Sequence, residues 1–343
     1  MSNTRLTIFD IAKIAGVSRS TVSRALNNDS GISDETKEKI LNVIKEMNYR
    51  PNVNARRTVT RRCECLGLYI GSRVLIRDAN SRVLSGIIAK CNEVAYDLVL
   101  RSSCSTDRLV EMYNEHKVDG FVILNPYPDI APMLEFLEAN NVPYACTAVC
   151  SDENKFLYVD TDNRRAAYDA VSYLIGKGHQ HIALLTEEPS IFSVDLRRAG
   201  YEACMRAHDL PIPENYIVSL PPRGAGMDLQ PMRRAFEGDT PPTAFFATSD
   251  EKAMRAIYWL RDNGYRVPED ISVIGFDDLP EATGEYPLTT IHQDFYMRGY
   301  VACESVLNRL NDPNRLIERR FLAHSLIERG SVRAIKDIRQ IGR

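Results

Sequence analysis

The sequence predicts a small all-α domain at the N-terminus, followed by a larger α/β body built on parallel sheets. Three observations support this fold class. The first 48 residues hold short segments with apolar residues at helical spacing. From about Leu66, short apolar runs alternate with helical segments, which is typical of parallel sheets in α/β layers. The roughly 280 residues of the body are too many for one ordinary core, so we expect two lobes.

Residues 7–27, TIFDIAKIAGVSRSTVSRALN, predict two short helices joined by a tight turn. Thr7 with Asp10 resembles a capping box, and Gly16 can take the left-handed conformation that ends a helix. The first helix has an apolar face formed by Ile8, Ile11, Ile14 and Ala15. In the second helix, capped by Ser18, we expect Val22, Ala25 and Leu26 inside and Arg19, Ser20, Thr21, Ser23 and Arg24 outside or at its leading end. Such an edge suits the DNA major groove, although a helical hairpin inside a larger core remains an alternative.

A third helix is predicted to begin after Ser33, which caps it, with Asp34 and Glu35 at its positive end. Its apolar stripe is formed by Ile40, Leu41, Ile44 and Met47. Pro51 breaks the pattern, because the residue before a proline disfavours helix. The segment NVNARRTVTRR at 52–62 is polar and basic, so it is predicted to be a linker.

The charge of the chain is unevenly distributed. Residues 1–62 hold 12 of the 43 Lys and Arg residues and only 6 of the 46 Asp and Glu residues, a net charge of +6. The rest of the chain therefore carries −9, and the whole chain −3. A small basic module on an acidic body is what phosphate contact by one module requires. An unevenly solvated surface is the alternative interpretation.

Several motifs together are similar to those of the lactose/galactose repressor (LacI/GalR) family. In the N-terminal part they are residues 7–27, ISDETKEKI, Tyr49, Pro51-Asn52 and Ala55-Arg56. In the body they are VDTDN at 159–163, LRRAGY at 196–201, FATSDEKA at 246–253, VPEDISVIGFDD at 267–278 and PLTTIHQDF at 287–295. The resemblance spans nearly the full length, and the ordered set is specific where any one motif would be weak.

The resemblance implies that the second helix lies in the major groove of operator DNA. Arg19 and Ser20 hold positions where the family varies its base-reading residues, and Arg24 holds one from which many members contact guanine. The residues at positions of phosphate contact are Thr7, Ser18, Thr21, Ser23, Asn27, Ser33, Thr36, Tyr49 and Asn52. Hydroxyl and amide donors around two helix N-termini agree with that role.

The hinge departs from the family pattern. Ala55, Arg56 and Thr58 fall in the segment that members place at the minor groove, and members usually have leucine where Thr58 stands. That leucine wedges between bases and kinks the duplex, whereas threonine is shorter and polar. We therefore expect weaker bending of the operator, unless Val59 takes the place of the wedge. Binding would then depend more on electrostatic attraction between the DNA backbone and the arginines at 56, 57, 61 and 62.

For the body, the resemblance implies two lobes like those of periplasmic sugar-binding proteins, a periplasmic-binding-protein-like fold. The chain is expected to cross between the lobes near residues 160, 291 and 320. We expect a helix-turn-helix DNA-binding domain over 1–48, a hinge or linker over 49–62, and an effector-binding and dimerisation domain over 63–343. Within it, lobe 1 is expected to cover about 63–160 and 292–320, and lobe 2 about 161–291 and 321–343. Ligand is expected in the cleft, at the carboxyl ends of the strands.

Two residues lead the predicted effector site. Arg197 matches the position whose guanidinium binds hydroxyls or a carboxylate of the effector, and Asp277 matches an acceptor for ligand hydroxyls. A fork donor and a carboxylate can hold vicinal hydroxyls from both sides, although a buried ion pair is the alternative for this pair. Further candidates are Asp162, Asn163, Ser249, Asp250 and Asn80. The loop containing Arg77, Asp78, Asn80 and Arg82 departs from the family pattern, so sugar acids, sugar phosphates and nucleobases stay open beside sugars.

Other signals are weak. Cys63/Cys65 and Cys146/Cys150 lack a second pair and histidines at zinc-finger spacing, and the eight cysteines suit a reducing cytosol. No phosphate loop, nucleophile elbow or HExxH motif is found, so we predict no cofactor, metal or catalytic site. No apolar run approaches membrane-spanning length, so we expect a cytoplasmic protein. The C-terminal tail RAIKDIRQIGR lacks heptads, which favours a homodimer over a tetramer.

These observations predict a DNA-binding transcriptional regulator, most simply a repressor. Its homodimer would bind a near-palindromic operator, and a small sugar-like effector would control it. A solute-binding protein without DNA function is the alternative that the body alone permits, and an α/β enzyme is a third class.

Overall fold

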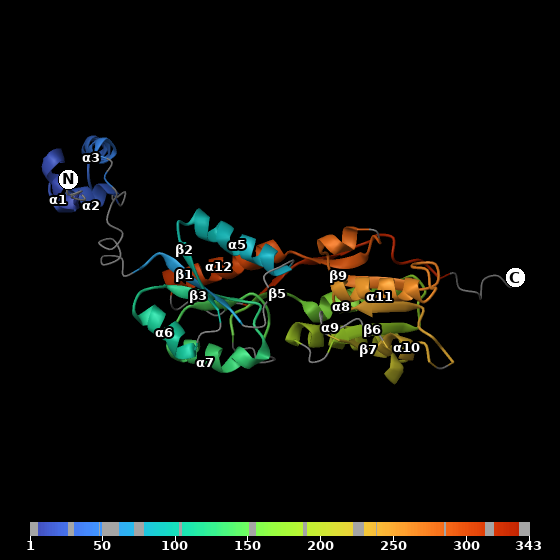
Figure 1. Cartoon of the computed structure of the whole chain (residues 1–343). Helices are drawn as coiled ribbons and strands as arrows, with labels where there is room; N and C mark the ends of the chain where they lie inside the picture. The colour runs from blue at the N-terminus through green and yellow to red at the C-terminus, as the bar shows by residue number, and fades with distance from the viewer. Residues whose placement is uncertain are drawn as a thin grey trace. The chain divides into compact units, whose positions relative to one another are not determined.

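The computed structural model describes residues 6–26, 31–47, 49, 62–71, 79–102, 105–150, 156–187, 191–221, 230–237, 239–284, 286–312 and 319–335 (Figure 1). The chain divides into two compact units, Met1–Glu64 and Cys65–Arg343. The first is all helical and the second contains every strand within these described ranges. The predicted fold class, a helical head followed by an α/β body with parallel sheets, is confirmed.

Three short helices form the head: α1 (Ile8–Ala15), α2 (Arg19–Leu26) and α3 (Asp34–Glu46). Their shared core contains Ile11, Ala15, Val22, Ala25 and Ile40, each at most 2% exposed. Three residues expected in the apolar stripes are instead exposed, namely Ile14, Leu41 and Met47, at 49%, 43% and 39%. The stripes are narrower than predicted because so small a head has little interior, and each helix buries only its innermost residues.

The first sheet of the body has four parallel strands in the order β2-β1-β3-β4. These are β1 (Cys65–Ile70), β2 (Asp97–Ser102), β3 (Gly120–Leu124) and β4 (Tyr144–Cys146). Figure 1 shows helices on both faces of this sheet, with α5 (Ala79–Glu93) and α12 (Phe295–Asn311) on one and α6 (Thr106–Asn114) and α7 (Ala131–Ala139) on the other. A short 3-10 turn, η1 (Pro128–Ile130), precedes α7. The central strands β1 and β3 are wholly buried, because helices cover both faces of the sheet.

The second sheet has six strands in the order β12-β10-β9-β8-β6-β7, of which only β12 runs antiparallel to its neighbour. The strands are β6 (Ile182–Glu187), β7 (Ile217–Leu220), β8 (Ala244–Ala247), β9 (Ser272–Asp277), β10 (Thr289–Gln293) and β12 (His324–Ile327). Its helices are α8 (Asn163–Gly176), α9 (Phe192–Ala207), α10 (Gln230–Arg234) and α11 (Asp250–Asp262), with the 3-10 turns η2 (Glu214–Tyr216) and η3 (Pro280–Thr283).

Alternate residues of this second sheet face two separate cores. Along β6, Ala183 and Leu185 pack with the α10 and α11 side, whereas Ile182 and Leu184 pack with α8 and α9. Because successive side chains of a strand point to opposite faces, a continuous apolar run is what a strand between two helical layers needs. The apolar runs LGLYI, DLVL, GFVIL, HIALL, TAFFA and ISVIGF correspond to β1, β2, β3, β6, β8 and β9.

The chain passes between the two sheets three times, and two of these passages are neighbouring strands. Strand β5 (Val159–Thr161) lies parallel to β11 (Arg320–Leu322), with Val159 opposite Arg320. Strand β5 leads into α8 on the second sheet, and β11 leads into β12 of the same sheet. A third passage follows β10, because the next helix, α12, packs against α5 on the first sheet. Within the described part of the chain, no helix is both long and apolar enough to cross a membrane.

Candidate nucleic-acid interface and ligand site

The start of α1 is held by the predicted capping box. The Asp10 carboxylate accepts hydrogen bonds from the backbone N–H of Thr7 (2.8 Å) and from its hydroxyl (2.7 Å). These bonds hold the pKa of Asp10 below its usual value. Gly16 ends the helix with φ 68°, in the left-handed region that favours glycine. A phosphate contact by Thr7 would therefore require its hydroxyl to turn away from Asp10.

Hydroxyl groups gather at the N-termini of α2 and α3. Ser18 Oγ accepts from the backbone N–H of Thr21 (3.1 Å) and lies 2.6 Å from Ser20 Oγ and 2.8 Å from Thr21 Oγ1. Ser33 Oγ accepts from the backbone N–H of Thr36 (3.3 Å) and lies 2.8 Å from its hydroxyl. Both helix ends thus present hydroxyl groups beside the N–H groups of their first turn, an arrangement suited to phosphate oxygens.

The three predicted base-reading residues, Arg19, Ser20 and Arg24, are exposed on α2. Ser23 is half-buried beside them. Tyr49 differs from the other predicted phosphate contacts, because it is 7% exposed and packs in the core of the head. The remaining residues of the predicted DNA surface lie outside the described ranges: Asn27, Asn52, Ala55, Arg56 and Thr58.

In the body, Arg197 lies at the centre of the predicted effector site. Its Nε donates to Asn163 Oδ1 (2.8 Å), and its Nη1 donates to the Thr248 carbonyl (2.6 Å) and Asp277 Oδ1 (3.3 Å). Its Cζ lies 3.8 Å from the centre of the Phe276 ring. Burial lowers the pKa of Arg197 and raises that of Asp277, and the attraction between the two charges opposes both shifts. Among the described residues, Arg197 Nη2 has no acceptor, which leaves one donor edge for a ligand.

Arg197 belongs to a closed chain of hydrogen bonds and one ion pair, which we name the polar ring: Asp160, Asn163, Arg197, Asp277, Gln293 and Arg298. Arg298 Nη2 lies 2.9 Å from Asp160 Oδ1 and also donates to Gln293 Oε1. Gln293 Nε2 donates to Asp277 Oδ1 (2.6 Å), and Asn163 Nδ2 donates to Asp160 Oδ2 (3.1 Å). The ring joins β5, α8, α9, β9, β10 and α12, so it ties together two of the passages between the sheets.

The backbone is strained where β9 ends. Asp277 has φ 127° and Asp278 has φ 58°, values that residues other than glycine rarely adopt. The Asp278 carboxylate is held by Arg329 Nη2 (2.6 Å) and His292 Nδ1 (2.9 Å). Such strain persists when the surroundings fix the residue, and it is concentrated at functional sites. Here it places the Asp277 carboxylate in the polar ring.

Asp250 is fully buried beside this strand end. Its Oδ1 accepts from the Thr290 hydroxyl (2.5 Å) and its Oδ2 from the Leu279 N–H (2.8 Å). Burial raises the pKa of Asp250 to about 7. Both oxygens are engaged by the protein, so a ligand would have to displace one of these bonds.

The other predicted effector residues have local roles. Ser249 caps α11 by accepting from the Lys252 N–H (3.4 Å), and Asp162 caps α8 by accepting from the Arg165 N–H (2.9 Å). Asn80 is the second residue of α5. The structure therefore brings Arg197, Asn163 and Asp277 into contact, whereas Ser249, Asp162 and Asn80 are outside the polar ring.

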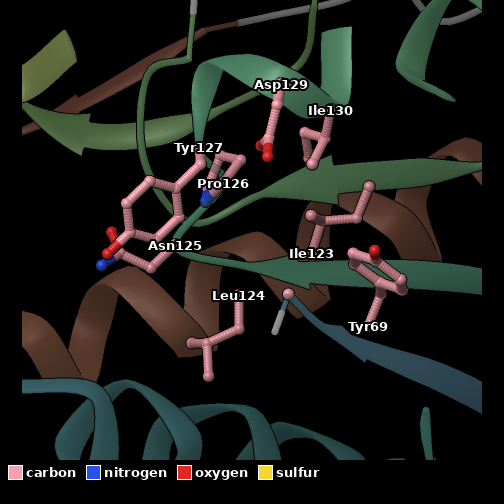
Figure 2. A pocket seen from close by; sticks show the side chains of 9 residues that line it. Tyr69, Ile123, Leu124, Asn125, Pro126, Tyr127, Asp129 and Ile130 are labelled. Atoms are coloured by element: carbon pink, nitrogen blue, oxygen red, sulfur yellow. The ribbon is translucent and has the colours of Figure 1, made fainter. Parts of the chain in front are cut away.

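A pocket lies at the carboxyl ends of β1 and β3, where open α/β sheets generally bind ligands (Figure 2). It is lined by Tyr69, Gly71, Ile123, Leu124, Asn125, Pro126, Tyr127, Asp129 and Ile130. Figure 2 shows Asn125 and Tyr127 from the loop after β3, with Asp129 on the 3-10 turn η1. None of these residues was predicted as an effector contact. No local sequence pattern marks them, because they line one pocket only after the chain has folded.

A helix-turn-helix head with exposed arginines and capped helix ends, joined to an α/β body with a buried polar site, defines a DNA-binding transcriptional regulator. The family description "Bacterial regulatory proteins, lacI family" matches residues 7–52, and "Periplasmic binding protein-like domain" matches residues 171–332. The ribose operon repressor of Escherichia coli (strain K12) is 31% identical over 342 residues, which cover 95% of this chain and 99% of the relative. The chain belongs to the LacI family and is a regulator, not an enzyme.

Two solved structures resemble the whole chain. The lac repressor dimer bound to operator and the anti-inducer ONPF is 27% identical, with a TM-score of 0.77 and coverage of 96% of this chain and all of that one. The complex of the transcriptional regulator CelR with cellobiose is also 27% identical, with a TM-score of 0.68 and coverage of 95% and 100%. These likenesses confirm the family and the two-part fold expected from the sequence.

Sequence reasoning missed three members of the polar ring, namely Asp160, Gln293 and Arg298. Asp160 and Gln293 both lie in motifs that carried the family resemblance, VDTDN and PLTTIHQDF, but the chemistry of each residue was not distinctive there. Arg298 stands in an otherwise apolar turn of α12, between Met297 and Gly299, and a charge at such a position is the one signal that could have marked it.

Proposed function

We propose that the chain is a repressor that binds a near-palindromic operator as a homodimer and is controlled by a sugar or sugar derivative. The observation that carries the effector part is the Arg197–Asp277 pair, a fork donor and a carboxylate held rigidly by the polar ring with one donor edge of Arg197 unused. Such a pair suits vicinal hydroxyls. The relatives support the class, since one is a ribose operon repressor and another is in complex with cellobiose.

In the DNA part, we infer that Arg19, Ser20 and Arg24 read base edges in the major groove. The hydroxyls of Ser18 and Ser33, with their neighbours, would then position the head on phosphates. Two heads read two half-sites, because the two-fold axis of a dimer matches that of the operator. Because a regulator of this kind acts on the chromosome, we infer that the chain is cytoplasmic and lies at the nucleoid when it binds DNA.

We infer that the dimer face lies on α5 and β2. Ile88 on α5, Val94 just after α5 and Leu100 on β2 are 42%, 37% and 54% exposed, and β2 is an edge strand of the first sheet. Exposed apolar residues beside an open strand edge are costly unless a partner covers them. Leu100→Asp should give a monomer in light scattering, whereas Phe136→Asp on α7, at a similarly exposed site, should not.

Fluorescence anisotropy with upstream DNA tests the regulator. Saturable, salt-sensitive binding to a pseudo-palindrome is expected, because phosphate contacts release counterions. A solute-binding protein or an enzyme would show no such binding. Absence of saturable, salt-sensitive binding by this chain would therefore overturn the proposal.

Thermal-shift screening of the full chain against sugars, sugar acids and nucleosides tests the effector. A ligand that binds only the folded state raises the melting temperature, by an amount that grows with its concentration. The shift should disappear in Arg197→Lys, which keeps the charge but loses the fork. A shift that survives this change would place the ligand elsewhere, for example in the pocket at the carboxyl ends of β1 and β3.

A further inference from the structure

Phe9 on α1 is the most exposed large apolar side chain in the described part of the chain, at 62%. Leaving an aromatic ring in water gives up the stabilisation that its burial would provide. Neighbouring residues of α1, such as Ile11 and Ala12, are buried in the head, so Phe9 points away from that core. A single exposed ring needs no explanation by itself, but this one has a specific neighbour.

The guanidinium of Arg19 lies over the Phe9 ring, with its Cζ 5.1 Å from the ring centre. Arg19 is the first residue of α2 and is itself exposed. Across the described residues, no carboxylate pairs with it, and Asp10, the acidic neighbour on α1, is engaged by Thr7. The contact between the helices is therefore a cation–π contact rather than an ion pair.

This difference matters for base reading. A carboxylate would occupy the N–H groups of the guanidinium, whereas an aromatic face leaves all five N–H donors free in their plane. Two of these donors bind guanine O6 and N7 when arginine reads a G·C pair. A free arginine side chain also loses rotamer entropy when it binds, and a ring that already limits the side chain reduces that loss.

We propose that Phe9 is a positioning residue that holds Arg19 ready to read one base pair in each half-site. The proposal rests on the proposed function, in which Arg19 reads DNA, and it adds a residue of α1 to the specificity of α2. Phe9 itself would not contact the base, so its removal should weaken the preference at the base pair read by Arg19 and leave the other positions unchanged.

The test is selection from a random DNA library with the full chain, comparing wild type with Phe9→Leu, Phe9→Tyr and Arg19→Ala. Leucine keeps an apolar side chain and a helix-forming residue but has no aromatic face. We expect Arg19→Ala to abolish the preference at one base pair per half-site. Phe9→Leu should reduce that same preference about two- to fivefold, the range for an exposed cation–π contact, and Phe9→Tyr should retain it. Equal non-specific affinity at low salt of the three proteins that keep Arg19 would show that the head is intact.

The proposal is overturned if Phe9→Leu selects the same sites as wild type with unchanged strength. It is also overturned if Phe9→Leu alters a base pair that Arg19→Ala leaves intact, because Phe9 would then touch DNA itself, for example a thymine methyl group. If Arg19→Ala changes no base preference, the base-reading role of Arg19 in the proposed function is wrong. The positioning role of Phe9 is then wrong as well, because it depends on Arg19 reading a base. These three results are distinct.

Discussion

Replacing Arg298 by methionine should destabilise the body more than any surface substitution. Arg298 and its partner Asp160 are almost wholly enclosed, with 7% and 1% of their side chains exposed, and their charged atoms lie 2.9 Å apart. Methionine fills much of the same space without a charge, so the change isolates the electrostatic loss. Breaking a buried pair by removing one partner typically costs about 3–5 kcal/mol, because the other charge stays buried.

The hydrogen bonds around Asp160 determine how much stability Arg298→Met removes. Three donors remain to its carboxylate after the change: the N–H groups of Val149 (3.1 Å) and Thr161 (2.7 Å) and Nδ2 of Asn163 (3.1 Å). Hydrogen bonds to a carboxylate offset part of its desolvation. We therefore expect a loss near the lower end, about 3 kcal/mol.

Urea unfolding monitored through the single tryptophan, Trp259, measures this loss, with circular dichroism as a second probe. Asp160→Asn with Arg298→Met completes a double-mutant cycle, and we expect the double variant to be more stable than Arg298→Met alone, because no buried charge is left without its partner. Arg206→Met, which removes an arginine from a more exposed pair with Glu202 on α9, is the control and should cost about 0–1 kcal/mol. A cost below about 1 kcal/mol for Arg298→Met, or strictly additive effects in the cycle, would refute the reasoning.

Four further predictions follow from single positions. Gly299→Ala should lower the free energy of unfolding by more than about 2 kcal/mol in urea titration, because its Cβ would lie 1.9 Å from the Val83 carbonyl oxygen, whereas Gly176→Ala, with nothing within 4 Å, should be neutral or stabilising. Burial lowers the pKa of His179, so its contribution to stability is present above about pH 6.5 and is lost as the pH falls through the folded value; the melting temperature of wild type should fall more steeply below pH 6.5 than that of His179→Gln. Arg24→Ala should weaken specific operator binding by about 1–3 kcal/mol in anisotropy while changing non-specific binding less, and an equal loss in both would make Arg24 a phosphate contact. Thr58→Leu should increase operator bending in circular-permutation gel shifts, and equal bending in both proteins would show that the hinge threonine is not the limiting feature.

Much of this architecture could be predicted from sequence because it depends on local patterns. The apolar runs that became β6 and β9 are continuous, as strands covered on both faces must be, and Thr7, Asp10 and Gly16 formed the cap and turn expected of them. The apolar stripes of the head were less reliable. Periodicity shows which side of a helix can be buried, but how much of that side is covered depends on the size of the partner surface.

The candidate ligand site was predictable only where a residue stood in a motif with a known role. Arg197 and Asp277 were found in that way, and the structure places them in contact. Gln293 and Arg298 were missed because what makes them part of the site is a meeting of segments far apart in the chain, from residue 160 to residue 298. The residues of the polar ring come together only because the chain passes between the two sheets. A short window of sequence never contains all of these residues, so local patterns cannot show that they meet.

The polar ring also bears on how an effector could control the proposed repressor. A ligand shifts a conformational equilibrium only through a difference in its interaction free energy with the two states. Asp277 Oδ1 already accepts from Gln293 (2.6 Å) and Arg197 (3.3 Å), so a ligand hydroxyl that uses this carboxylate changes bonds reaching both β10 and α9. Since Gln293 stands immediately before the passage to α12, a change in its hydrogen bonds acts where the two sheets are connected. Ligands that bind only in the pocket at the carboxyl ends of β1 and β3 would leave these bonds unchanged, and we therefore expect them to bind without altering operator affinity.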